Sequence, residues 1–386
     1  MNITLAAGGT GGHMVPAHAL AAELKARGHG VMLVTDDRGT KIPAIFEDVP
    51  VHVLPAGRLG GGPIGMLKAV RSVLKGRKEA KRLYREFTPD AVVGFGGYPA
   101  FPALLGANAL GIPTVLHEQN AVLGRVNRWL AGKAAAIATA YSEVKRLKPE
   151  YRGKVHLVGN PVREEVAVLG TLPFPEYDDT APLKILVTGG SQGATILGQF
   201  VPSGLGQLPP RLRHRLQVVQ QCRADDIEAV RKRYADLNIP AELLTYITDM
   251  PAKIGDCHLV IARAGASTIA ELTAAGRPAI LIPLPIATDD HQTYNALEMA
   301  KAGGARMIPQ PEFTPEMLAE QVAVIAGDSQ AMANAAARAL SVGHPHATRD
   351  LADLVERIAG GERPVLVGKV EEVREPRIAM GAGAAA

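Results

Sequence analysis

Apolar residues in this chain come in short unbroken runs, and most of the runs lead into a glycine-rich turn and then a helical pattern. The first of these runs lie at residues 2–7, 30–35, 90–98, 112–120, 134–140 and 154–162. An unbroken apolar strand is typical of a parallel sheet that is covered on both faces. The regular succession of strand and helix therefore predicts an α/β fold built on doubly wound parallel sheets.

The same order of features starts again near the middle of the chain. The stretch LKILVTGGSQGA (183–194) has the strand, glycine turn and helix start of the N-terminus, and more strand-like runs follow it. We therefore predict two tandem Rossmann-like domains that face a central cleft. We place them at residues 1–161 and 162–344, with a helix at about 345–361 that packs back on the first domain. Residues 362–386 are predicted to be a disordered tail.

The composition narrows the class of protein without giving its function. The chain has 386 residues, 47% hydrophobic and 21% charged, as expected for two globular domains. A formal charge of +4 does not indicate a nucleic-acid partner. Only two cysteines are present, and they form no metal or disulfide pattern. We expect no signal peptide and no membrane span, because no run of about 18 apolar residues occurs.

Two glycine loops stand at equivalent places in the predicted domains: GGTGGH (8–13) and GGSQGA (189–194). A helix N-terminus presents unpaired N–H groups, and glycine lets an anion approach the backbone, so both loops suit a phosphate. The alternative is that the glycines only make tight turns. Asp36 and Asp37 follow the second strand, where an acidic residue would bind the ribose of NAD, but Met14 occupies the position of the third glycine in the dinucleotide-binding fingerprint. The phosphate-binding P-loop motif does not occur in the sequence.

Three further stretches allow either a binding role or a structural one. The loop GFGGYPAFP (94–102) offers backbone donors to a second phosphate-bearing substrate, or is a turn packed with aromatic residues. Thr268 and Glu271 have the spacing of a capping box, but the Glu271 carboxylate also suits a ribose diol. The third stretch (residues 289–295) either binds sugar hydroxyls or starts a solvated helix with aspartate caps. Its polar residues are Asp289, Asp290, His291, Gln292 and Asn295.

Taken together, these motifs resemble the MurG family of peptidoglycan N-acetylglucosaminyltransferases. The resemblance rests on GGTGGH (8–13), GFGGY (94–98), HEQN (117–120), GNPVR (159–163), GGSQGA (189–194), RAGASTIAEL (263–272) and DHQTYNA (290–296). It implies a GT-B fold and an inverting transfer of GlcNAc from UDP-GlcNAc to the C4 hydroxyl of MurNAc in undecaprenyl-diphospho-MurNAc-pentapeptide (lipid I), giving lipid II and UDP. It also implies a peripheral enzyme on the cytoplasmic face of the cell membrane, with other cell-wall synthesis proteins as partners.

The resemblance also implies site residues, motif by motif. Arg163 and Ser191 would lie at the donor's diphosphate, Ile247 at the uracil and Glu271 at the ribose. Gly96, Gly97 and Tyr98 would bind the acceptor diphosphate, although Pro99–Pro102 depart from the commoner family pattern. The full set expected to bind UDP-GlcNAc is Thr10, Gly11, Gly12, Asn120, Arg163, Ser191, Ile247, Ala266, Ser267, Thr268, Ile269, Ala270, Glu271 and Gln292.

The chemistry of such a transfer requires a base. A sugar hydroxyl is a poor nucleophile at neutral pH, and an imidazole is the side chain best suited to accept its proton. We expect His13 to be this base, with Glu118 as the second candidate; the alternative is that His13 only caps a helix or orients a loop. Helix N-termini and Arg163 would stabilise the charge on the leaving UDP. We therefore expect no metal and no cofactor, and no D-x-D motif occurs.

A lipid-linked acceptor calls for a membrane surface. Residues 66–85 contain eight Lys or Arg and one Glu, and place Leu67, Val70 and Leu74 on one helical face. This basic amphipathic pattern suits anionic lipid headgroups, or is an ordinary solvated helix face. Three other functions stay open on the sequence: another GT-B lipid glycosyltransferase, a UDP-GlcNAc 2-epimerase and a non-catalytic nucleotide-sugar binding module.

Overall fold

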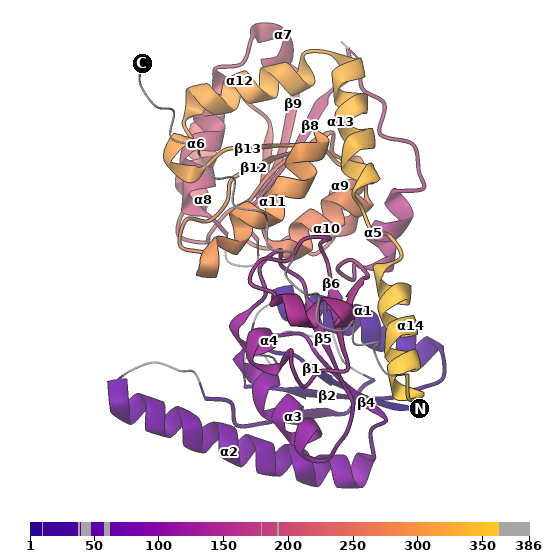
Figure 1. Ribbon diagram of the computed structural model, residues 1–386. Coiled ribbons are helices and arrows are strands. Elements are labelled where there is room, and N and C mark those ends of the chain that lie inside the picture. Colours follow the sequence, from indigo (N-terminus) through magenta and orange to yellow (C-terminus); the bar gives the residue numbers. More distant parts are fainter. Residues whose placement is uncertain are drawn as a thin grey trace, which may run out of the picture.

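A computed structural model describes residues 1–9, 11–37, 39, 48–57, 62–178, 180–190 and 193–362. Two of the expected donor residues, Thr10 and Ser191, lie outside these described residues, and so does the predicted tail beyond Glu362. The described chain forms two α/β units, one above the other in Figure 1. The predicted α/β class and its tandem parallel sheets are confirmed.

The first sheet has seven parallel strands among the described residues, in the order β3-β2-β1-β4-β5-β6-β7. Its central strands β4, β5 and β6 are buried along their whole length, and β1 and β2 along all but their first residue, because helices cover both faces. The bounds are β1 (Asn2–Ala6), β2 (Gly30–Thr35), β3 (Val51–Val53), β4 (Ala91–Gly94), β5 (Thr114–Glu118), β6 (Ala136–Thr139) and β7 (Val155–Leu157).

The second sheet repeats this plan with six described strands, all parallel, in the order β10-β9-β8-β11-β12-β13. Sequence reasoning anticipated all of these strands except β3 and β13, which have three residues each and lie at or beside the edge of a sheet. The bounds are β8 (Leu183–Thr188), β9 (Leu216–Gln221), β10 (Ala241–Leu244), β11 (Leu259–Ala262), β12 (Ala279–Leu281) and β13 (Ala305–Met307).

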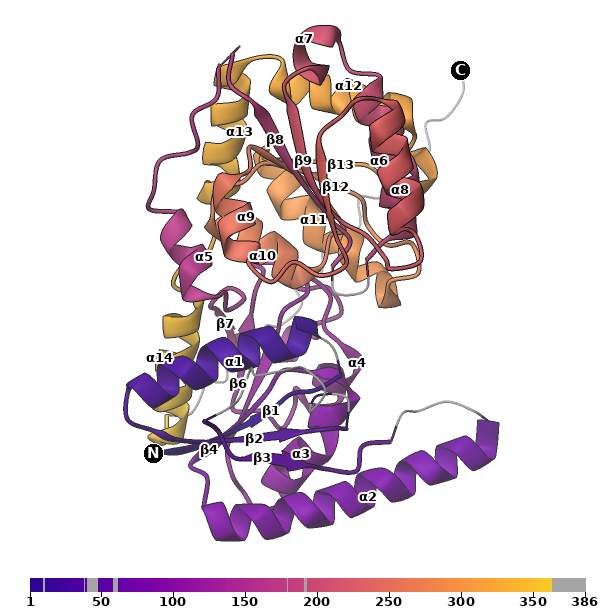
Figure 2. The same ribbon diagram turned by 180° about the vertical axis from the view of Figure 1, so that it is seen from behind.

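Helices lie between most successive strands along the chain and pack on the two sheets (Figures 1 and 2). In the first unit they are α1 (Gly11–Ala26), α2 (Gly62–Phe87), α3 (Gly97–Ala109) and α4 (Arg125–Leu130), with the 3₁₀ turn η2 (Pro149–Lys154). In the second they are α5 (Glu164–Leu169), α6 (Thr195–Gly206), α7 (Pro210–Arg213), α8 (Ile227–Asp236), α9 (Met250–Asp256), α10 (Ala266–Ala274), α11 (His291–Ala302), α12 (Pro315–Ala326) and α13 (Ser329–Ser341), with η3 (Thr288–Asp290) and η4 (Gln310–Glu312).

The last helix, α14 (Ala347–Ala359), leaves the second unit and packs on the first, beside α1 (Figure 2). Its buried face, which includes Leu351, Leu354 and Val355, joins the core of the first unit. Arg27 at the end of α1 donates to Asp353 at 2.6 Å and to Glu356 at 2.9 Å. The chain thus crosses twice between the units and ties them together by apolar packing and by ion pairs.

Strand order fixes where a ligand site forms. In a doubly wound sheet the crevice opens beyond the carboxyl ends of the two strands where the chain reverses its winding direction. That point lies between β1 and β4 in the first sheet and between β8 and β11 in the second. Gly8 and Gly9 therefore lie at the same edge of the first sheet as residues 94–97, and Gly189 and Gly190 lie at the same edge of the second sheet as residues 263–266.

Candidate active site

His13 is the third residue of α1, and its ring lies at the β1/β4 switch point. Its Nδ1 is 2.7 Å from the carbonyl oxygen of Phe95, the residue after β4. Because a carbonyl oxygen can only accept, Nδ1 carries the proton and donates it, which places the ring's lone pair on Nε2. This is the tautomer that a general base acting through Nε2 requires.

Gln119, the residue after β5, reaches the same ring nitrogen, with its amide nitrogen placed 2.6 Å from His13 Nδ1. A protonated Nδ1 cannot accept, so the carboxamide is better satisfied with its two ends exchanged and Oε1 facing the ring. As placed, Oε1 has no hydrogen-bond partner among the described residues, and the exchange gives it one. The ring is then fixed by oxygens from the ends of two neighbouring strands.

Two glycines pack against the His13 ring, and both have positive φ angles, +81° at Gly96 and +72° at Gly97. A Cβ atom at Gly97 would lie 3.3 Å from His13 Nε2, and one at Gly96 would lie 3.6 Å from its Cε1. Any larger residue here would strain the backbone and crowd the ring. The same turn starts α3, so the backbone N–H groups at that helix start lie next to His13.

Glu118 is 2% exposed, and both its carboxylate oxygens accept hydrogen bonds. Oε1 accepts from the backbone N–H and the side-chain amide of Asn120, at 3.1 and 3.3 Å. Oε2 accepts from Gly124 N at 2.7 Å and from Asn127 Nδ2 at 2.9 Å. Burial raises the pKa of Glu118, and these donors oppose the rise. The carboxylate thus organises the loop between β5 and α4. Sequence reasoning missed Asn127, for which no motif gave a signal.

On the donor side, Arg163 and Glu271 pair with each other. Glu271 Oε1 accepts from Arg163 Nη2 at 2.7 Å and from Nε at 3.1 Å. Burial raises the pKa of Glu271, while the guanidinium opposes that rise. The capping box predicted for Thr268 and Glu271 is wrong: α10 begins at Ala266 with Gly265 as its N-cap and no side-chain cap. Thr268 is therefore already inside the first turn, and the Glu271 carboxylate pairs with Arg163 instead of capping the helix.

The start of α10 lies at the carboxyl end of β11, at the switch point of the second sheet. Ser267 in its first turn has a buried hydroxyl with no hydrogen-bond partner in the described part of the chain. Ile269 is buried in the core, as is Ile247, which follows β10. Gly11 and Gly12, which open α1 in the other unit, and Ala270 are only half-buried. These helix starts present backbone N–H groups, whereas their apolar side chains pack inward.

Arg263, between β11 and α10, is a further cation that sequence reasoning did not select as a site residue. It is 9% exposed, and its guanidinium donates to the carbonyl oxygens of Ile282 and Pro283 and to Gln310 Oε1. All three acceptors are neutral, so its charge is not compensated by them and contributes positive potential at this switch point. An arginine directly after the apolar strand LVIA is the signal that was available.

The polar residues 289–295 separate into different roles. Gln292 is half-buried, and its Oε1 accepts from Leu284 N at 3.0 Å. Asp289 pairs with Arg128 and Arg146 of the first unit, at 2.9 and 3.1 Å. Asp290 is the N-cap residue of α11, in a left-handed conformation, and accepts from Thr293 Oγ1. Asn295 is fully buried between the units, so a direct role in reading sugar hydroxyls is wrong for it.

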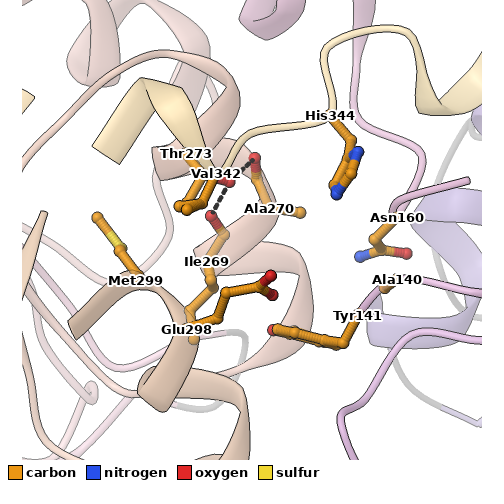
Figure 3. A pocket seen from close by; sticks show the side chains of 11 residues that line it. Ala140, Tyr141, Asn160, Ile269, Ala270, Thr273, Glu298, Met299, Val342 and His344 are labelled. Atoms are coloured by element: carbon orange, nitrogen blue, oxygen red, sulfur yellow. Dashed lines mark hydrogen bonds between the residues drawn. The ribbon is translucent and has the colours of Figure 1, made fainter. Parts of the chain in front are cut away.

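A small cavity of about 30 Å³ also lies between the units, where Tyr141 and Asn160 face Glu298 and His344 (Figure 3). That volume holds one or two water molecules and is too small for a nucleotide sugar. The cavity touches the face of α10 formed by Ile269 and Thr273, one turn apart. It also touches Ala266, the first residue of α10, but Ser267 is not among its lining residues.

Two Rossmann-like sheets in tandem, each with a glycine-rich turn at its switch point, are the architecture of the GT-B class, and the family matches identify the chain as a glycosyltransferase of that class. The chain matches the glycosyltransferase family 28 N-terminal domain over residues 3–139 and the glycosyltransferase family 28 C-terminal domain over residues 184–357. The crystal structure of Acinetobacter baumannii MurG has a TM-score of 0.75 and 32% identity, and the match covers 92% of this chain and 99% of that one.

Relatives from other bacteria narrow the class further. A UDP-N-acetylglucosamine--N-acetylmuramyl-(pentapeptide) pyrophosphoryl-undecaprenol N-acetylglucosamine transferase of Erythrobacter litoralis is 57% identical over 99% of this chain and 96% of its own length. The Zymomonas mobilis protein of the same name is 60% identical over 92% of each chain. The chain belongs to this family of transferases, the MurG family.

Proposed function

We propose that the protein transfers GlcNAc from UDP-GlcNAc to the C4 hydroxyl of MurNAc in lipid I, giving lipid II and UDP with inversion at the anomeric carbon. Family membership supports the substrates, since the relatives carry this activity in their names. The single observation that carries the mechanism is the His13 ring, held through Nδ1 at the switch point with its lone pair on Nε2. No described group of three or more His, Cys, Asp and Glu is placed to hold a metal ion.

In this proposal His13 Nε2 takes the proton of the acceptor hydroxyl as its oxygen attacks the anomeric carbon. The new C–O bond forms on the face opposite the breaking bond to the diphosphate, and UDP leaves with the electron pair. Gly96 and Gly97 lie beside the ring, and Tyr98 follows them in the first turn of α3, where backbone N–H groups suit the acceptor's diphosphate. Since that start lies at the same switch point as His13, hydroxyl and base would meet there.

The donor would lie across the start of α10. Backbone N–H groups of residues 266–268, in the first turn of α10, and the unpartnered Ser267 hydroxyl suit its phosphates, and the buried cation of Arg263 adds positive potential. The N–H of Ile269 already donates to the carbonyl oxygen of Gly265, so Ile269 and Ala270 stay predictions as phosphate ligands. Glu271 would accept from both ribose hydroxyls, with Arg163 holding the carboxylate in place and lying near the diphosphate. Gln292 would read the sugar, with Gly11, Gly12 and Asn120 approaching it from the first domain. Thr10, Ser191 and the Ile247 backbone stay predictions.

Glu118 has a different part in this proposal. Its two oxygens already accept four hydrogen bonds inside the loop from Asn120 to Asn127, so proton transfer would require breaking them. We therefore propose that Glu118 positions this loop and that His13 is the base. The two roles differ experimentally, since loss of a base leaves the fold intact, whereas loss of Glu118 loosens the loop.

UDP release with and without a soluble lipid I analogue, in the presence of EDTA, tests the function. UDP release only with acceptor supports the transferase. Epimerisation of UDP-GlcNAc without acceptor would indicate the 2-epimerase. No reaction with or without acceptor would indicate a binding module. We expect His13→Ala to lower kcat by about 10²–10⁴-fold at unchanged UDP affinity. His18→Ala, on the same helix, is the matched control and should keep the wild-type rate. Near-normal turnover in His13→Ala would rule out the base assignment.

We also propose that α2 binds the membrane surface. None of the helices in the described ranges is both long and apolar enough to cross a bilayer. Along α2, however, four apolar side chains are 45–57% exposed: Met66, Leu67, Val70 and Leu74. Exposed basic residues flank them, and the helix lies at the end of the molecule farthest from the second domain in both views (Figures 1 and 2). Apolar insertion with surrounding positive charge suits an anionic bilayer.

Vesicle co-sedimentation tests this surface. Replacing Lys68, Arg71, Lys75 and Lys78 by Gln removes exposed charges and should weaken binding to anionic vesicles by about fivefold per charge. Replacing Leu67, Val70 and Leu74 by Ser should weaken binding at high salt as well, because apolar insertion is not screened. The control is Arg231→Gln with Lys232→Gln, two exposed charges of α8. Equal binding by all three variants would remove the proposal.

A further inference from the structure

Asn295, in the second turn of α11, makes hydrogen bonds in both domains. Its Oδ1 accepts from the backbone N–H of Ala121 at 2.8 Å. Its Nδ2 donates to Asn120 Oδ1 at 3.1 Å and to the carbonyl oxygen of Ala264 at 3.3 Å. The side chain is 0% exposed. A carboxamide has two N–H hydrogens, so both of them and the oxygen of Asn295 are in use.

These hydrogen bonds of Asn295, called the Asn295 bridge below, reach two loops that take part in the proposed reaction: the loop before α10 and the HEQN motif. Ala264 lies two residues before the start of α10, where the donor's phosphates would bind. Asn120 belongs to the HEQN motif, and its own amide donates to Glu118 at 3.3 Å. The Asn120 carboxamide is therefore held from both sides, by Glu118 in its own domain and by Asn295 of the other domain. Gln119, between Glu118 and Asn120, is the residue that contacts His13.

Only an asparagine fits this position chemically. An aspartate would still accept from Ala121 N–H, but it would face two oxygens, those of Asn120 and Ala264, without a donor. An alanine would leave all three groups without a partner in a buried place. A second link between the domains, the pair of Asp289 with Arg128 and Arg146, lies just before α11 and touches neither the HEQN motif nor residue 264.

We propose that Asn295 is a positioning residue that sets the HEQN loop, and with it the His13 ring, in register with the donor loop when the cleft is closed. The proposal rests on the proposed function, because the register matters only if the sugar is transferred between these loops. Donor binding to the second domain would not depend on the bridge, whereas the chemical step would. Misplacing a base by about 1 Å is enough to lower a rate by about 100-fold.

Kinetics test the role in catalysis. We expect Asn295→Ala to lower kcat by about 10- to 100-fold at unchanged UDP affinity and binding stoichiometry. We expect Asp289→Asn, which breaks only the ion pair, to stay within about threefold of wild type. The ratio of kcat for Asn295→Asp to kcat for Asn295→Ala should rise as pH falls, because a protonated aspartate regains one donor. Wild-type kcat in Asn295→Ala, or an equal loss in Asp289→Asn, would overturn the proposal.

Hydrogen exchange separates this proposal from the proposed function. The Ala121 amide is protected by the Asn295 oxygen, so the peptide around residues 119–123 should exchange about tenfold faster in Asn295→Ala. The core of α11 around Met299 should exchange as in wild type. If the wild-type protein transfers no sugar, the proposed function is wrong. The difference in exchange between wild type and Asn295→Ala would still show whether the hydrogen bond from Ala121 to Asn295 exists. Unchanged exchange at 119–123 would overturn the bridge itself.

Discussion

His117 makes the stability of the first domain sensitive to acid, and the effect can be calculated. The side chain is fully buried beside Phe95, with Nε2 3.2 Å from the carbonyl oxygen of Gly159. Nδ1 has no partner among the described residues. Burial, the largest cause, lowers the pKa of His117 from 6.5 to about 4. The native state therefore holds this ring neutral, while the unfolded chain protonates it near pH 6.5.

The direction and size of this pH effect on stability follow from proton linkage. Between pH 6.5 and 4 the unfolded state binds more protons than the native state, so stability falls as pH falls. A shift from 6.5 to about 4 removes about 2 kcal/mol by pH 5 and about 3 kcal/mol by pH 4. Above pH 7 the contribution is fully present. We expect His117→Gln, which keeps a donor for Gly159 and cannot titrate, to lack this loss.

Denaturant unfolding followed by Trp129 fluorescence is the suitable assay. Trp129 is the single tryptophan and lies in α4 of the same domain, so its signal reports that domain. The stability of wild type minus that of His117→Gln, measured at each pH, should fall by about 3 kcal/mol from pH 7 to pH 4. Other carboxylates and histidines cancel in this difference. A difference that stays constant across this pH range would refute the reasoning.

Three other outcomes follow from the structure. We expect Glu271→Ala to bind UDP and 2′-deoxy-UDP equally, whereas the wild type should prefer UDP by about 10- to 100-fold; competition binding measures this, and an unchanged preference would contradict the ribose role. We expect Glu118→Gln to lose about 2–3 kcal/mol of stability together with activity, because its amide would face two donors; full stability by denaturant unfolding would count against that network. We expect Arg27→Ala to loosen α14 by about 1 kcal/mol, seen as faster hydrogen exchange at Leu351, with exchange of α8 as the control.

The local pattern of the chain was enough to predict the elements. Unbroken apolar runs such as 2–6, 91–94 and 259–262 became fully or almost fully buried strands, because a parallel sheet covered on both faces has no polar side. The glycine loops after them predicted where helices start, and their phosphate-binding role stays a prediction. The edge strands β3 and β13 were not predicted: each has only three residues and no glycine in the three positions that follow it, whereas the equally short edge strand β7 is followed by GNP (159–161).

What the side chains do was decided by the tertiary structure. Thr268 and Glu271 have capping-box spacing, yet Glu271 pairs with Arg163, 108 residues away, because α10 begins at Ala266. Asn295 resembled a sugar-reading carboxamide, yet it bridges to Asn120, 175 residues away. The spacing of apolar residues and glycines along the chain predicts which positions are buried and where turns form, because both depend largely on residues that are near in the sequence. Contacts between residues so far apart depend on strand order and on how the two domains dock, and no local pattern encodes either.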